Sequence, residues 1–223
     1  MRMFTESDGW VAMLDDVLFT ASMLEASGVH VALAKPLDAQ IANWDSLEID
    51  RVKLERTAVR AEARIAWLNL DLDGRTRFFG AQLLLECGGN RGHATFTRFF
   101  PVNVTTVVRL ALESQVESMR LWPKLGEALG LPKASASALA AAVVLFVPAD
   151  EAIAARNDTA TAQTLGSVKQ AAWRDDANRA RRAVEAALLD YANKHGLAHD
   201  DPDAFFPKRK AAAKPAAPDP QPA

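Results

Sequence analysis

The single cysteine of the chain and the histidine six positions after it are the residues best suited to chemistry. Cys87 and His93 lie with Asn90 in the stretch LLECGGNRGHATFTRFFP, residues 83–100. A thiolate–imidazole pair acts only when the two side chains meet in space and a third group, such as Asn90, orients the histidine. The glycines and the asparagine of this stretch are instead the residues that tolerate the left-handed conformation at a helix end. We interpret the stretch as a break between two helices and Cys87 as an ordinary thiol.

Metal-binding and phosphate-binding patterns are incomplete throughout the sequence. A zinc site needs three or four ligands, and the other histidines, His30, His195 and His199, are far apart in sequence. Neither H-E-x-x-H nor the E-x-x-H of di-iron bundles occurs. GGNRGH at 88–93 lacks the G-K-[S/T] ending of a phosphate loop, and DLDG at 71–74 lacks the later ligands of a calcium loop. We therefore expect no catalytic residue, no metal and no cofactor, which favours a non-enzymatic protein.

Basic residues form three clusters: two at helical positions could contact phosphates, and the third resembles a nuclear-localisation cluster. They are Lys53, Arg56, Arg60 and Arg64 at helical spacing; Arg179, Arg181 and Arg182; and PKRK at residues 207–210. Acidic residues accompany the first two clusters, so we interpret both as solvated helix faces. The third lies in an Ala/Pro/Lys-rich composition and is interpreted as part of that bias. Because the net charge is −2, we do not expect nucleic acid as a partner.

Tryptophans are the remaining candidates for a binding site. The five are Trp10, Trp44, Trp67, Trp122 and Trp173. Aromatic residues within helical patterns usually belong to the core, and this is the interpretation we prefer. The alternative is that they line a pocket for an apolar small molecule.

One long helix carries the clearest periodicity. Apolar residues alternate at spacings of four and three at Leu54, Ala58, Ala61, Ile65, Leu68, Leu72, Arg75 and Phe79. The pattern predicts one continuous, coiled-coil-like helix over 47–86, starting at the capping box Asp45-x-x-Glu48. Gly74 is the position where it would break if it broke at all. Arg75, the charged member of this seam, is expected at the edge of the bundle or beside a carboxylate.

Shorter patterns predict the other elements. A first helix follows the capping box Thr5-x-x-Asp8 and stops at Gly28, and Pro36 is expected to break or kink the next segment. Residues 93–100, HATFTRFF, are expected to form a short helix or a short strand. One helix with a kink at Pro123 is expected after a cap at Asn103. A buried helix at 134–147 is interrupted at Pro148, and the last helix runs over 159–195 and stops at Gly196.

Together these elements predict an all-α antiparallel bundle of roughly five to seven helices over residues 1–207. From 208 the composition is limited to a few residue types, so 208–223 is expected to be a disordered tail. One cysteine excludes an internal disulfide. The longest apolar run, 134–149, is shorter than the roughly 20 residues of a membrane span. Acidic residues from Glu6 onward interrupt a signal peptide, and we expect a cytoplasmic protein without membrane insertion.

The absence of a complete chemical motif decides the expected function. The leading hypothesis is a non-enzymatic protein-interaction or structural module with a protein partner or self-association. The alternative is a helical bundle that encloses an apolar small molecule. A third hypothesis is an enzyme whose active residues are scattered along the sequence.

Overall fold

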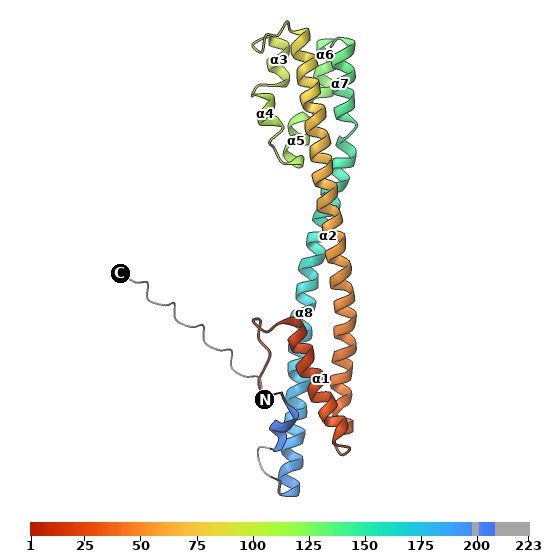
Figure 1. Cartoon of the computed structure of the whole chain (residues 1–223), viewed down its shortest axis with the longest axis vertical. Helices are drawn as coiled ribbons and strands as arrows, with labels where there is room; N and C mark the ends of the chain where they lie inside the picture. Colours follow the sequence, from red (N-terminus) through yellow and green to blue (C-terminus); the bar gives the residue numbers. More distant parts are fainter. Residues whose placement is uncertain (198–200, 208–223) are drawn as a thin grey trace, which may run out of the picture. The chain divides into compact units, whose positions relative to one another are not determined.

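The computed structural model describes residues 1–197 and 201–207 of the 223-residue chain. Every regular element in these two ranges is helical, which confirms the all-α prediction (Figure 1). The long helices are α2, Val31–Glu86, and α8, Phe146–His195, and α1 is Trp10–Ala26. The short helices are α3, Ala94–Phe99; α4, Val104–Val107; α5, Leu112–Met119; α6, Trp122–Leu129; and α7, Lys133–Val143; a 3-10 helix, η1, spans Asp201–Phe205. The predicted tail at 208–223 lies outside the described residues.

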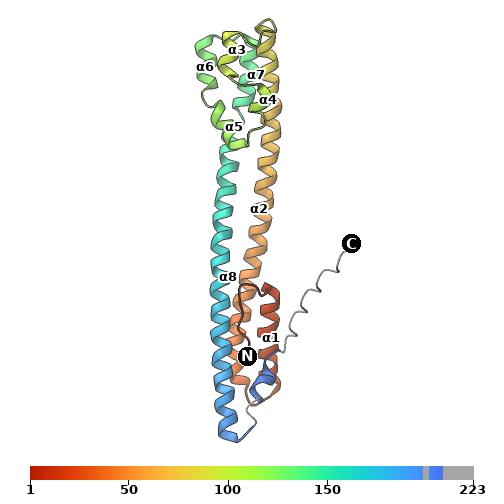
Figure 2. The same cartoon turned by 90° about the vertical axis from the view of Figure 1, so that its left-hand side faces the viewer.

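The chain divides into two compact units, each with its own hydrophobic core. Unit 1 contains Met1–Ile49 and the described residues from Gly166 onward, and unit 2 contains Asp50–Leu165. Both long helices run through both units. In unit 1, α1 lies beside the first part of α2 and the last part of α8; in unit 2, α3 to α7 gather around the C-terminal part of α2 (Figures 1 and 2).

The long helix α2 confirms the predicted continuity and corrects the predicted start. It passes through Gly74 without a break and ends at Glu86, as expected. It begins at Val31, however, so the predicted start at Asp45 was wrong, and Pro36 lies inside α2 without breaking it. Proline removes one backbone hydrogen bond here, but its neighbours Ala34 and Leu37 are fully buried in the core of unit 1. Their burial offsets the lost bond.

The segment after Asn103 is three helices and not the single kinked helix that the sequence suggested. Asn103 caps α4 through its side-chain oxygen, which accepts a hydrogen bond from the Thr105 N–H at 3.1 Å, as predicted. The chain then turns at Arg109 and Leu110, and Pro123 lies in the first turn of α6, where proline is tolerated. The turns direct the apolar residues of all three helices into one core, which a straight helix would not do.

The start of α8 also differs from the prediction. It begins at Phe146, so Pro148 falls in its first turn and does not interrupt it, and no new helix starts near 159. The predicted stop is confirmed, because α8 ends at His195 and Gly196 has a φ of +66°. The stretch Lys133–His195 is long and apolar enough to cross a membrane by length and composition alone. Its residues Ala142 and Ala149 are fully buried in unit 2.

Aromatic residues organise both cores. In unit 2, Phe79, Phe99, Phe100 and Trp122 pack against one another with ring centroids 5.0–5.8 Å apart. In unit 1, Trp10 stacks on Trp44 at 5.4 Å and meets Trp173 edge-on at 4.9 Å. The core interpretation therefore holds for four of the five tryptophans, and Trp67 is the exception at 65% exposure.

Candidate functional site

The Cys87–His93 stretch is a break between two helices, as the sequence indicated. Gly88 and Gly89, directly after α2, have φ values of +64° and +76°. The His93 Nδ1 accepts a hydrogen bond from the Thr95 N–H at 3.2 Å, so the imidazole caps α3. The half-buried Cys87 packs against the core of unit 2. These side chains thus have structural partners of their own.

The basic stripe on α2 is a partly paired helix face. Lys53 lies 3.9 Å from Asp50, and Arg64 donates to Glu151 of α8 at 3.1 Å. Arg56 and Arg60, between them, are exposed.

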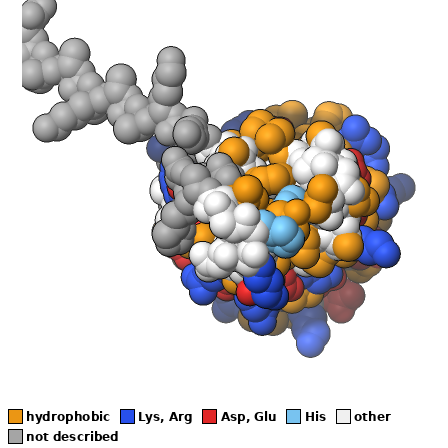
Figure 3. Space-filling model, turned by 90° about the horizontal axis from the view of Figure 1, so that it is seen from below, with side chains coloured by type: hydrophobic (Ala, Val, Ile, Leu, Met, Phe, Trp, Pro, Cys, Tyr) orange, Lys and Arg blue, Asp and Glu red, His pale blue; other side chains and the backbone are white. Residues whose placement is uncertain are grey.

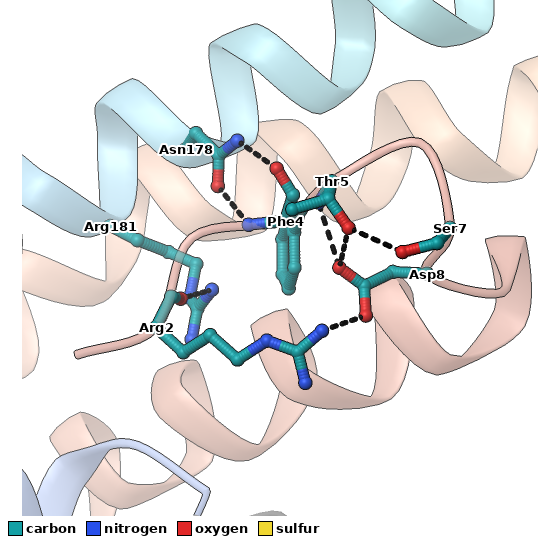
Figure 4. Close-up of polar contacts among 7 residues, drawn as sticks. All are labelled: Arg2, Phe4, Thr5, Ser7, Asp8, Asn178 and Arg181. Carbon is teal, nitrogen blue, oxygen red and sulfur yellow. Dashed lines mark hydrogen bonds and ion pairs between the residues drawn. The ribbon is translucent and has the colours of Figure 1, made fainter.

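Arg181 contradicts the interpretation of Arg179, Arg181 and Arg182 as a solvated face, since only 1% of it is exposed. Its Nη1 donates to the Arg2 carbonyl oxygen at 2.9 Å, and its guanidinium carbon lies 4.3 Å from the centroid of the Phe4 ring (Figure 4). A guanidinium over an aromatic face keeps part of its charge stabilised without water. Arg181 is therefore a structural residue of unit 1.

The N-terminal segment is docked on α8 through backbone recognition. The Asn178 Oδ1 accepts from the Phe4 N–H at 2.8 Å, and its Nδ2 donates to the Phe4 carbonyl at 3.1 Å (Figure 4). The terminal ammonium group donates to Glu185 at 2.8 Å, and this hydrogen bond raises the pKa of that group. Asn178 and Arg181 are thus polar residues on the buried side of α8, 7% and 1% exposed.

Two histidines that are far apart in sequence lie around one tyrosine in unit 1. The His30 ring meets the Tyr191 ring edge-on at 4.6 Å, and the His195 ring stacks on Tyr191 at 3.9 Å. Figure 3, which views the molecule from below relative to Figure 1, shows histidine side chains among hydrophobic ones. Within the described ranges, no three His, Cys, Asp or Glu side chains come together as a group that could hold a metal ion.

Unit 2 contains a buried polar cluster beneath α5. The Gln115 Nε2 donates to the Thr76 Oγ1 at 3.4 Å, and both residues are fully buried. The Asp73 Oδ1 is buried without a hydrogen-bond partner in the described structure. Burial raises the pKa of Asp73, and the nearby Gln115 amide and Arg77 guanidinium lower it only in part. The cluster thus holds a carboxylate whose charge the fold stabilises poorly.

A second apolar stripe on α2 is the feature that the sequence analysis missed. Its large members are between 57% and 72% exposed, and exposed small residues lie between them. The stripe consists of Val59, Ala63, Trp67, Leu70, Gly74, Phe78, Ala81 and Leu85. Successive members are three or four residues apart, so all eight share one face of the helix, opposite the buried seam of Leu68, Leu72 and Phe79.

The middle of this stripe is hollowed at Gly74. A hollow of about 360 Å³ is lined by Trp67, Leu70, Asp71, Gly74, Arg75, Phe78 and the α7 residue Ala141. The position of Gly74 itself is open, since a Cβ there would meet no heavy atom within 4 Å. Leu70 and Phe78 flank Gly74 along the helix, so the hollow could accommodate an apolar side chain from another molecule.

Arg75 holds the rim of the hollow in place. Its Nε and Nη2 donate to the two Asp71 carboxylate oxygens at 2.9 and 2.8 Å, and its Nη1 donates to the Ala141 carbonyl at 2.6 Å. The expectation that Arg75 lies at the edge or meets a carboxylate is confirmed on both counts. The bidentate pair with Asp71 neutralises the charge beside the stripe, and the hydrogen bond to the Ala141 carbonyl connects α7 to α2.

The sequence does contain a signal for the stripe. Its spacings are as regular as those of the buried seam, but Ala63, Gly74 and Ala81 dilute its hydrophobicity. The helix α2 therefore has apolar residues on two opposite faces. One face packs into the core of unit 2, and the described residues leave the other face exposed.

Comparison with known proteins adds no relative from which a function could be transferred. The chain matches no protein-family model, no curated protein and no solved structure.

Proposed function

We propose that the protein is a non-enzymatic helical interaction module and that the α2 stripe is its binding surface. The observation that carries this proposal is the row of large exposed side chains Trp67, Leu70, Phe78 and Leu85 on a single helix face. Exposed apolar residues occur singly on most proteins, but a contiguous row of them marks a surface that another molecule covers.

The form of the surface favours a helix as the ligand. Anchor residues three, four and seven positions apart are the arrangement by which one helix packs along another. The hollow at Gly74 lies between α2 and the α7 residue Ala141, so an incoming helix would have a groove rather than a flat ridge to rest on. Trp67 and Phe78 flank it, and aromatic residues contribute most to such contacts.

Site-specific photo-crosslinking in source cells tests the proposal. We would replace Phe78 with benzoylphenylalanine and, as a control, replace Leu121, which is 71% exposed in the same unit but outside the stripe. The expected result is a discrete protein adduct of defined mass from position 78 and none from position 121. Equal adducts from both positions, or none from position 78, would contradict a protein-binding stripe.

A second candidate function is the binding of an apolar small molecule in unit 2. A hollow of about 400 Å³ in unit 2 is lined mainly by apolar residues, among them Phe99, Leu110 and Trp122, and its size is that of an ordinary ligand pocket. If it holds a ligand, the protein isolated from its source retains a small molecule that mass spectrometry detects, and adding that molecule quenches the fluorescence of Trp122. Leu125→Trp, which narrows the same hollow, would then abolish retention.

A further inference from the structure

We infer that the α2 stripe binds the same stripe of a second copy of this chain, with the two helices antiparallel about a two-fold axis. This inference rests on the proposed function and names its partner. In such a contact, each residue of one copy meets the residue equally far from the axis on the other copy. The side chains of the stripe, taken from its N-terminal end, must therefore fit the same side chains taken from its C-terminal end.

The order of side chains in the stripe meets this condition. From Val59 to Leu85 the order is aliphatic, Ala, aromatic, Leu, Gly, aromatic, Ala, aliphatic. Read backward, the outer positions are the same in type: aliphatic faces aliphatic, Ala63 faces Ala81, and Trp67 faces Phe78. The four facing pairs have nearly the same midpoint along α2, so each residue lies within one position of its partner in the second copy. Only the central pair differs, and it differs in size.

The central pair supplies the interlocking contact. Antiparallel pairing places Leu70 of each copy opposite Gly74 of the other, where the hollow of about 360 Å³ lies. A leucine inserted between large side chains over a position without a side chain is knobs-into-holes packing. The two-fold axis makes this contact twice, and the two alanine pairs let the helix backbones approach closely.

The apolar area is sufficient for a stable contact. From ordinary side-chain sizes, the exposed area of the large stripe residues is on the order of 600 Å² per copy, so pairing would bury about 1,200 Å². This equals the lower limit of specific protein interfaces. A parallel arrangement would place Gly74 opposite Gly74 and leave the hollow empty.

Charge does not oppose the pairing. None of the eight stripe residues is charged, and Asp71, which lies close to the axis, is already paired with Arg75 of its own chain. Arg77 flanks the stripe, is 60% exposed, and comes opposite Trp67 of the second copy. A guanidinium over an indole face is a favourable contact, so Arg77 would add a polar rim to the apolar centre.

Sedimentation equilibrium of the purified full chain tests the association. The wild type is expected as a dimer at tens of micromolar, and Gly74→Arg as a monomer with unchanged helical circular dichroism. A Cβ at this position meets no heavy atom within 4 Å in the monomer, and arginine would place a charge in the apolar centre of the dimer. The matched control Leu121→Arg should remain a dimer. A monomeric wild type, or a Gly74→Arg variant that dimerises as well as the wild type, overturns the inference.

The orientation is tested by the distance between two spin labels. Arg60 is exposed beside the stripe, and Cys87→Ser removes the competing thiol, so Arg60→Cys gives one label per chain. Antiparallel pairing separates the two labels by 24 residues along the helix axis, or about 36 Å at the rise of an α-helix. A parallel pair would bring them within about 15 Å, which overturns the inferred geometry.

The two proposals can fail separately. If the purified chain is a monomer while position 78 crosslinks to a protein of a different mass, the second copy is excluded and the interaction module remains. If position 78 gives no protein adduct and the chain instead binds vesicles of anionic phospholipid through Phe78, both proposals fall.

Discussion

At the scale of single residues, polar side chains determine how the N-terminal segment is held in unit 1. Phe4 is 6% exposed, so its backbone N–H and carbonyl have no access to water and depend on the Asn178 amide. Asparagine offers one donor and one acceptor on the same planar group, and this pairs with both backbone atoms of one residue. The Arg181 guanidinium lies over the face of the Phe4 ring, 4.3 Å from its centroid.

Asn178→Ala should therefore lower the free energy of unfolding by about 1–3 kcal/mol, because it leaves a buried donor and a buried acceptor without partners. Asn157→Ala, on the exposed side of the same helix, is the control and should cost less than about 0.5 kcal/mol. Chemical unfolding measures both variants. A loss at Asn178 no larger than at Asn157 would mean that the segment is not anchored by this amide.

Asp73 gives a pH-dependent prediction at the same scale. Burial raises its pKa in the folded protein, so the folded state resists its ionisation. Its neutral form therefore favours folding below the ordinary aspartate pKa of about 4, and this contribution is lost as the pH rises through the raised value. Asp73→Asn, which does not titrate, should be more stable than the wild type at pH 7, and the difference should shrink at pH 3. Urea unfolding at both pH values is the measurement; a difference independent of pH would exclude ionisation of Asp73 as its cause.

At the scale of elements, two glycines of α2 have opposite roles. Gly74 is in an open position, and a Cβ there meets nothing within 4 Å. A Cβ at Gly80 would lie 3.1 Å from a Val104 side-chain atom and 3.3 Å from a Phe100 side-chain atom, so a larger residue would push these two side chains away from α2. The first glycine shapes a surface and the second permits a packing contact.

Gly74→Ala should therefore stabilise the monomer by up to about 1 kcal/mol, through the higher helix propensity of alanine. Gly80→Ala should give no such gain and should lower stability, because Val104 and Phe100 must move. Thermal unfolding of the two variants, compared at a concentration where both are monomeric, is the test. An equal gain from both would show that the packing around Gly80 is looser than the structure describes.

The buried seam of α2 gives a graded series. Leu72 is fully buried, Ile65 is half-buried and Glu62 is exposed, although the periodicity made the first two equivalent. Leu72→Ala should cost about 2–5 kcal/mol, Ile65→Ala about 1–2 kcal/mol, and Glu62→Ala about 0.5 kcal/mol or less. Chemical unfolding orders the three losses. Equal losses at Leu72 and Ile65 would contradict the burial difference.

These elements also show what periodicity can and cannot predict. The continuity of α2 through Gly74 followed from the unbroken periodicity of its apolar residues. The stops at Gly28 and Gly196 followed from the positive φ that glycine tolerates at a helix end. The starts of α2 and α8 did not follow from the periodicity, because burial of Ala34 and Leu37 outweighs Pro36, and Pro148 lies in the first turn of α8, where proline is tolerated.

The candidate surface was missed for a related reason. Periodicity identifies a face but does not tell which neighbour covers it. The stripe from Val59 to Leu85 has the spacing of a core face, and only the arrangement of the other helices leaves it exposed. Arg181 is the converse case, since a charge in a polar run is buried by contacts with Arg2 and Phe4 from the other end of the chain.

At the scale of the whole molecule, the two units have separate cores connected by two continuous helices. The core of unit 1 is built around Trp173 and Leu24, and that of unit 2 around Phe79 and Leu72. No described residue belongs to both cores, so a cavity in one core removes no packing contact from the other. We therefore expect each unit to unfold locally without unfolding of the other unit.

Hydrogen exchange with mass spectrometry tests this independence. Leu24→Ala creates a cavity in unit 1 and Leu72→Ala creates one in unit 2, and both side chains are fully buried. The first variant should accelerate amide exchange in α1 and in residues 31–49 of α2, and leave α5 and α7 at wild-type rates. The second should accelerate exchange in α5, α7 and residues 50–86, and leave α1 unchanged. Leu121→Ala, which removes an exposed side chain, should alter neither pattern. Acceleration of α1 and α7 together in either core variant would mean that α2 and α8 couple the two cores into one cooperative unit.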